Sequence, residues 1–238
     1  MAYYGLSNPY MAALDASAET YSSGFRCGKA ISTAVTPNYS SASLYADNSE
    51  AERVDEFVNA NVTVGTDRLP SNAANALFGH TVTSGEETDN AEDANAYVGY
   101  GFWVSKMEDG KKTYRGVVLA KVKFTEGEES YQTKGDQITF QTPQLTGSAT
   151  ALSNGDWRYK SPDFPTEINA DAWIRTKLGM TVTYTEVTNP ASGANPAAEG
   201  WYERTGTGTA QDPYVYTLSA KTTVGSDTFY KADAYSPS

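Results

Sequence analysis

Alternation of apolar and polar side chains is the clearest pattern in this chain, and it is strongest in residues 57–64. Val58, Ala60, Val62 and Val64 take every second position, with polar residues between them. A period of two gives a strand one apolar and one polar face. The pattern therefore predicts a β-strand with one face in a core.

A short helix is expected directly after this strand. Asp67 is expected to cap it, Pro70 is tolerated in its first turn, and Gly79 suits its end. Helical spacing and propensity are carried by Ala73, Ala74, Ala76, Leu77 and Phe78. A helix of about eleven residues is marginal in isolation and has to pack on a sheet.

A hairpin is expected further along, with strands at residues 96–107 and 113–125 and a turn at Asp109-Gly110. The second strand has a buried face made of Gly116, Val118, Ala120, Val122 and Phe124. Shorter strands are expected at residues 6–10, 24–28, 30–35, 40–45 and 137–147. Pro37 is expected to end the third of these.

Two segments have weaker patterns. Residues 83–95 are acidic and without periodicity, which predicts a mobile loop. Residues 169–178 fit either a short helix or a final strand. The pattern there does not choose between the two.

The composition changes near Asn189. Residues 189–198 are rich in Pro, Gly and small side chains and predict a linker between a domain at 1–188 and a small β-module at 199–238. The module is expected to contain three strands, at residues 200–204, 214–218 and 228–232. The fold class is therefore expected to be mainly β.

The charge and composition narrow the range of possible functions and partners. The net charge is −11, and such a protein does not hold nucleic acid through its overall field, although DNA can still slide past its surface. We expect no signal peptide, because the start has neither a basic region nor an apolar run. No apolar stretch approaches the roughly 18–20 residues of a membrane helix, so no membrane partner is expected.

The residues that carry chemistry are few. His80 is the only histidine and Cys27 the only cysteine. We interpret them as a surface or turn residue and a small core hydrophobe, and we expect no catalytic, cofactor or metal site. Residues 126–129 include paired carboxylates, but a solvated loop is the better interpretation. Trp201 and Tyr202 fit core packing better than a sugar platform.

The order of several motifs resembles the major tail protein of long-tailed bacteriophages, the tail tube subunit. The motifs are residues 4–10, residues 44–48 with Glu50 and Glu52 after them, the strand-to-helix run ending Leu77-Phe78-Gly79, residues 96–104, and residues 133–142. They cover about the first two thirds of the chain. The C-terminal module departs from the minimal tube subunit.

The resemblance implies a β-sandwich of the tail tube type with one flanking helix, plus the small C-terminal β-module. Six subunits form a ring, one sheet of each joins a continuous barrel around a lumen, and rings stack into a tube. The partners are then other copies of the chain, a tape measure protein, a tail terminator and tail tip proteins. DNA passes through the lumen on ejection. The protein is assembled in the host cytoplasm and resides in the virion tail.

An acidic lumen wall avoids the phosphate contacts that basic side chains make. The candidates for lumen or ring-interface positions are Asp47, Asn48, Glu50, Glu52, Asp55 and Glu56. Glu52 and Glu56 share one strand face and Asp55 lies on the other, so not all of them can point inward. The alternative function is a carbohydrate- or receptor-binding decoration protein of the virion, and an enzyme is the least favoured class.

Overall fold

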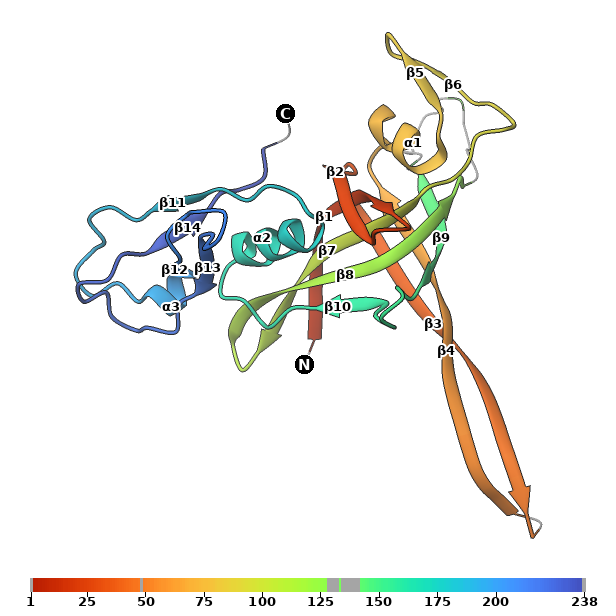
Figure 1. The fold of residues 1–238 in the computed structure, drawn as a ribbon, viewed down its shortest axis with the longest axis horizontal. Helices are drawn as coiled ribbons and strands as arrows, with labels where there is room; N and C mark the ends of the chain where they lie inside the picture. The colour runs from red at the N-terminus through yellow and green to blue at the C-terminus, as the bar shows by residue number, and fades with distance from the viewer. Residues whose placement is uncertain (1, 48, 128–132, 134–141, 237–238) are drawn as a thin grey trace.

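The computed structural model describes residues 2–47, 49–127, 133 and 142–236, and these are mainly β-structure. The largest sheet has eight antiparallel strands in the order β2-β1-β7-β8-β9-β4-β3, with β10 paired to β8 (Figure 1). Its strands are β1 Ala2–Asp15, β2 Thr20–Arg26, β3 Ala30–Ala46, β4 Ser49–Thr66, β7 Tyr97–Glu108, β8 Lys111–Thr125, β9 Gln144–Thr150 and β10 Arg158–Lys160.

The sheet curls so that its two halves share one core. The Thr33 hydroxyl on β3 and the Tyr100 hydroxyl on β7 are hydrogen-bonded at 2.6 Å, although β3 and β7 are not neighbours in the sheet. The fully buried side chains Val62 and Val64 come from one half, and Met11 comes from the other. A sheet that folds over itself buries one face without needing a second sheet.

Helix α1, Ser71–Phe78, lies on this core with Ala73, Ala74, Leu77 and Phe78 buried. The predicted helix is confirmed, and Gly79 ends it in the left-handed conformation at φ 83°. The predicted cap is wrong. The Asp67 carboxylate accepts a hydrogen bond from the Lys29 backbone N–H at 2.6 Å instead, and the helix begins only after Pro70.

The predicted hairpin is confirmed as β7–β8. Asp109 and Gly110 have φ of 49° and 75°, as a two-residue turn of type I′ requires. The buried face of β8 is the predicted one. The strand expected at 137–147 is described only from Gln144, as β9, and residues 137–141 lie outside the described part.

Residues 169–178 lie in a helix, α2 Glu167–Lys177 and its C-terminal cap. The Thr166 hydroxyl accepts a hydrogen bond from the Asn169 backbone N–H and caps the helix. Ile174 and Leu178 are fully buried against Tyr10 and Val118 of the sheet in a second core cluster. The helix therefore covers the face of the sheet opposite the first core.

A second sheet contains the three predicted C-terminal strands and one more. Its order is β11-β14-β12-β13, with β11 Tyr184–Glu186, β12 Tyr202–Thr205, β13 Val215–Leu218 and β14 Tyr230–Ala232. Because β11 precedes residue 188, the expected domain boundary does not coincide with the edge of this sheet. The expected linker at 189–198 also holds the start of α3, Pro196–Glu199.

The strand end expected at Pro37 is wrong, and the loop expected at 83–95 is only partly right, because residues 89–95 alone lie outside strands and the turn between them. β3 continues through Pro37 to Ala46, because β3 is an edge strand and needs backbone hydrogen bonds on one side only. The acidic segment 83–95 contains most of a small hairpin, β5 Thr81–Thr83 and β6 Glu86–Thr88. No helix in the described residues has the length and hydrophobicity needed to cross a membrane.

Candidate functional site: the β3–β4 arm

The most distinctive surface feature is a two-stranded arm, residues 39–57 of β3 and β4. β9 pairs with β4 only from Ala60 to Gly65. Beyond this point, β3 and β4 pair only with each other among the strands that the structure describes. Eight residues of β3 from Tyr39 onward extend the arm by about 25 Å at 3.3 Å per residue. Figure 1 shows the arm projecting away from the body of the molecule.

The side chains of the arm whose burial is described are exposed, apart from Phe57 at its base, and they include apolar residues. Leu44 keeps 61 % of its surface exposed and Val54 keeps 54 %. Only its base is anchored, where Phe57 stacks on Trp157 with ring centroids 4.5 Å apart. An isolated two-stranded ribbon is marginally stable in water, so an arm of this length gains stability from a surface that covers it.

The register divides the arm into two faces, because residues directly opposite in an antiparallel pair point the same way. Ala42 faces Val54, Leu44 faces Glu52, and Ser40 faces Glu56. We call this side the apolar face because it carries Ala42, Leu44 and Val54, although Ser40 and the carboxylates of Glu52 and Glu56 also lie on it. The pairs Ser41–Asp55 and Ser43–Arg53 lie on the other side, the polar face. The prediction that Glu52 and Glu56 share a face opposite Asp55 is confirmed.

The polar face satisfies its own groups. Ser41 Oγ donates a hydrogen bond to the Asp55 carboxylate, and Arg53 Nε lies 3.2 Å from the same oxygen. The Ser41 hydrogen bond, followed by Arg53, lowers the pKa of Asp55. No side-chain hydrogen bond or ion pair joins the described residues of the apolar face, and it is the side with surface left to bury.

The tip reverses the chain in two residues, with Asp47 at φ 49°. Asn48 lies outside the described residues. A register shift between Leu44 and Tyr45 places Glu50 beside the polar face, where Ser43 Oγ donates to its carboxylate at 2.8 Å. Residues 47–56 thus carry five carboxylates and one arginine, and the whole arm is acidic.

A second group of polar side chains surrounds His80, where the sequence-based interpretation was wrong. The ring is buried, and its Nδ1 lies 2.9 Å from Glu87 Oε1 and 3.0 Å from Asp89 Oδ1. Its Nε2 lies 2.6 Å from Glu126 Oε1. Hydrogen bonding to Glu87 raises the pKa of His80, although burial opposes this.

One local signal could have located this cluster. Ser84 and Gly85 both have positive φ and form the turn that brings β6 back along β5. A Ser-Gly turn between two short Thr-rich and Glu-rich segments predicts a hairpin, and the hairpin places Glu87 near His80. Glu126 comes from the end of β8, far along the chain, and no local pattern indicates its approach.

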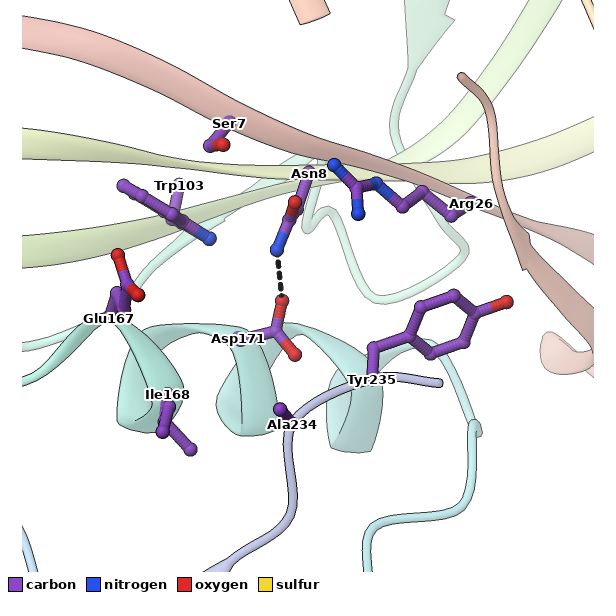
Figure 2. Close-up of a pocket in the computed structure, with 9 residues that line it drawn as sticks. All are labelled: Ser7, Asn8, Arg26, Trp103, Glu167, Ile168, Asp171, Ala234 and Tyr235. Carbon is purple, nitrogen blue, oxygen red and sulfur yellow. Dashed lines mark hydrogen bonds between the residues drawn. The ribbon is translucent and has the colours of Figure 1, made fainter. Parts of the chain in front are cut away.

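A third feature is a pocket of about 290 Å³ between β1, α2 and the C-terminal segment (Figure 2). The Asp171 carboxylate accepts hydrogen bonds there from Asn8 at 2.8 Å and Tyr10 at 2.7 Å. Burial and the neighbouring Asp171 raise the pKa of Tyr10. Two donors that line the pocket, Trp103 Nε1 and Arg26 Nε, are buried and have no hydrogen-bond partner among the described residues.

The remaining candidate residues pack in the interior. Cys27 is fully buried, as predicted, and burial raises the pKa of its thiol to about 12. Trp201 and Tyr202 are 4 % and 7 % exposed, so their rings are covered by the small sheet and leave little face for a sugar. Of residues 126–129, the structure describes Glu126 and Gly127 only.

The chain matches no protein-family model, and no curated protein is significantly similar to it.

Proposed function

We propose that this protein is a self-assembling structural subunit, the tail tube protein of a long-tailed bacteriophage. The observation that carries the proposal is the arm. It is a long, exposed ribbon whose apolar face presents Leu44 and Val54 to solvent. Full burial of an aliphatic side chain of this size contributes about 1.5–3 kcal/mol, so a partner surface that covers this face gains appreciable binding energy.

Sheet edges support the same proposal. β3 runs along one edge of the eight-stranded sheet for 17 residues, and β2 forms the opposite edge. Long open edges invite pairing with another chain, and closure into a barrel removes them. In the proposed ring, sheets of six copies join around a lumen, and rings stack into a tube of the β-sandwich subunits that the family resemblance implies.

The partners follow from this role. Other copies of the chain cover the arm, a tape measure protein fills the lumen during assembly, and terminator and tip proteins bind the two ends. DNA passes the wall without being held, which agrees with the acidic character of the arm. We expect the apolar face to contact a neighbour, and substitution of individual carboxylates on each face tests which side of the arm lines the lumen.

Sedimentation velocity on the purified chain tests the proposal. Val54→Ser on the apolar face should shift rings or larger assemblies toward the monomer. Val215→Ser is a matched control, since Val215 is equally exposed, at 53 %, but lies on the small sheet. A wild-type chain that stays monomeric at all concentrations, or equal effects of the two substitutions, would contradict the proposal.

A second candidate function, binding of a carbohydrate or receptor, is favoured by the pocket in Figure 2. Buried donors without partners are uncommon, and Trp103 Nε1 and Arg26 Nε are available to acceptor groups of a ligand. Glycan-array binding that is lost in Trp103→Phe, which keeps an aromatic ring but removes the N–H, would support this function. The absence of any glycan signal would contradict it.

A further inference from the structure

We propose that His80, Glu87 and Asp89 form a binding site for a divalent transition-metal cation, with Zn²⁺ as the preferred ion. The site is separate from the arm and does not depend on the proposed function. It joins the segment after α1 to the β5–β6 hairpin.

The spacing of the three side chains suits one ion. His80 Nδ1, Glu87 Oε1 and Asp89 Oδ1 all lie within 4.8 Å of one another. Zn²⁺ holds imidazole nitrogen and carboxylate oxygen at about 2.0–2.2 Å, so side-chain shifts of a few tenths of an ångström bring all three atoms into its coordination shell. The carboxylates of Glu87 and Asp89 are 37 % and 69 % exposed and leave a path from solvent.

The orientation of the imidazole distinguishes this site from an ordinary group of surface carboxylates. The His80 side chain is only 8 % exposed, and Phe78 lies against it at 5.4 Å between ring centroids. Asn75 Nδ2 donates a hydrogen bond to the His80 backbone carbonyl at 2.7 Å and fixes the segment. A buried ring held in this way aims Nδ1 at Glu87 and Asp89 before any ion binds.

Glu126 supplies the outer partner that metal-bound histidines usually have. It lies 2.6 Å from His80 Nε2 and accepts the hydrogen of that nitrogen. In the protonated ring Nδ1 donates its hydrogen to Glu87. In the neutral ring with its hydrogen on Nε2, the Nδ1 lone pair faces the two carboxylates, and no hydrogen lies between these three acceptors. A cation at that point satisfies all three, and a carboxylate behind the other ring nitrogen is the usual arrangement around zinc.

The charges of the cluster favour a divalent cation between the carboxylates over protonation of His80 alone. Three carboxylates surround one imidazole, so even a protonated ring leaves an excess of two negative charges. In the described part of the chain, no lysine or arginine lies within ion-pair distance of Glu87, Asp89 or Glu126. A mixed nitrogen and oxygen ligand set favours Zn²⁺ over Ca²⁺ or Mg²⁺, which prefer oxygen alone.

Isothermal titration of the full chain with ZnCl₂ at neutral pH tests the proposal. We expect one ion per chain and a rise in the melting temperature that EDTA reverses. Asp89→Asn should weaken binding at least tenfold, and its exposed position makes loss of the fold unexpected. Glu126→Gln should weaken it about 10-fold or more while leaving all three ligands in place. Glu86→Gln, an exposed neighbour on β6, is the matched control and should bind as the wild type does.

Three results would overturn the proposal. Titration without a stoichiometric transition would show that the cluster is held by hydrogen bonds and a proton only. Equal Zn²⁺ affinity in the wild type, Asp89→Asn and a folded His80→Asn would place the ion elsewhere. Ca²⁺ binding as tight as Zn²⁺ binding would contradict the transition-metal class. If His80→Asn fails to fold, the comparison of Asp89→Asn with Glu86→Gln decides.

Discussion

The Arg175 guanidinium on α2 contacts the Asp233 carboxylate at 3.0 Å, just after β14 and 58 residues along the chain. The same side chain is 2 % exposed and also pairs with Asp171 at 3.0 Å, which in turn accepts hydrogen bonds from Asn8 and Tyr10 of β1. One buried cation therefore connects the large sheet, α2 and the small sheet. The small sheet packs as part of the fold, since Ala172 of α2 lies in its core.

Removing the Arg175 side chain should destabilise the whole fold. In Arg175→Ala, Asp171 is left buried without its ion partner, and breaking such a pair costs about 3–5 kcal/mol. Urea unfolding followed by circular dichroism measures the loss. Lys177→Ala, two residues along the same helix and solvent-exposed, should change the free energy of unfolding by less than about 0.5 kcal/mol. Equal stability of the two variants would show that the network does not hold the sheets together.

The Cys27 thiol should be unreactive in the folded protein. Burial, with a smaller effect of Asp67, raises its pKa to about 12, so almost no thiolate forms near pH 8. Ellman's reagent at pH 8 should label less than a tenth of the chains in buffer and all of them in denaturing urea. Rapid stoichiometric labelling without urea would contradict the buried position.

The ion pair of Asp163 should make stability depend on acid pH. Partial desolvation tends to raise the pKa of Asp163, but the hydrogen bond from Lys106 and the charge of Arg115 outweigh it and lower the pKa. A folded-state pKa below the unfolded value of about 3.9 stabilises the protein above that pH, and the contribution is lost as the pH falls through the folded-state pKa.

Urea unfolding at pH 7 and pH 3 measures this effect. Asp163→Asn should be less stable than the wild type at pH 7, and the difference should shrink at pH 3. Asp109→Asn in the β7–β8 turn is the control, because asparagine also tolerates positive φ there. A difference that is the same at both pH values would indicate a steric effect of the Asp163 substitution.

If the chain forms the proposed tube, carboxylates on only one face of the arm should affect the passage of DNA. Repulsion of phosphate acts only within a screening length of about 8 Å at physiological salt, so only the face at the lumen matters. If the apolar face is luminal, Glu52→Gln with Glu56→Gln should leave tubes intact and slow ejection, whereas Asp55→Asn should not. The reverse result assigns the lumen to the polar face. Ejection kinetics unchanged in both variants would rule out an electrostatic role for the arm.

The sequence correctly predicted those turns, helix ends and strands that are determined by residues close together in the chain. The turn at Asp109-Gly110 and the helix end at Gly79 depend on backbone conformations that few residues adopt, so the residue type reveals them. The alternation from Val58 to Val64 correctly identified a strand. It did not reveal that Ala60 is fully buried while Val58 is 55 % exposed, because that depends on where β9 stops pairing.

Three errors share a cause, which is competition from residues distant in sequence. Asp67 has the right type and position for a helix cap, yet Lys29 on the segment before β3 takes its carboxylate. His80 looked solvent-exposed because Glu126, at the end of β8, gives no local sign of approaching it. Similarly, β11 is too short to be recognised alone and exists because β14 pairs with it.

Negative-stain electron microscopy of the purified wild-type chain is the decisive test of self-assembly. We expect rings or stacked tubes with a central channel, and their loss in Val54→Ser but not in Val215→Ser. Uniform single particles without a channel, at concentrations well above those of the sedimentation experiment, would contradict it.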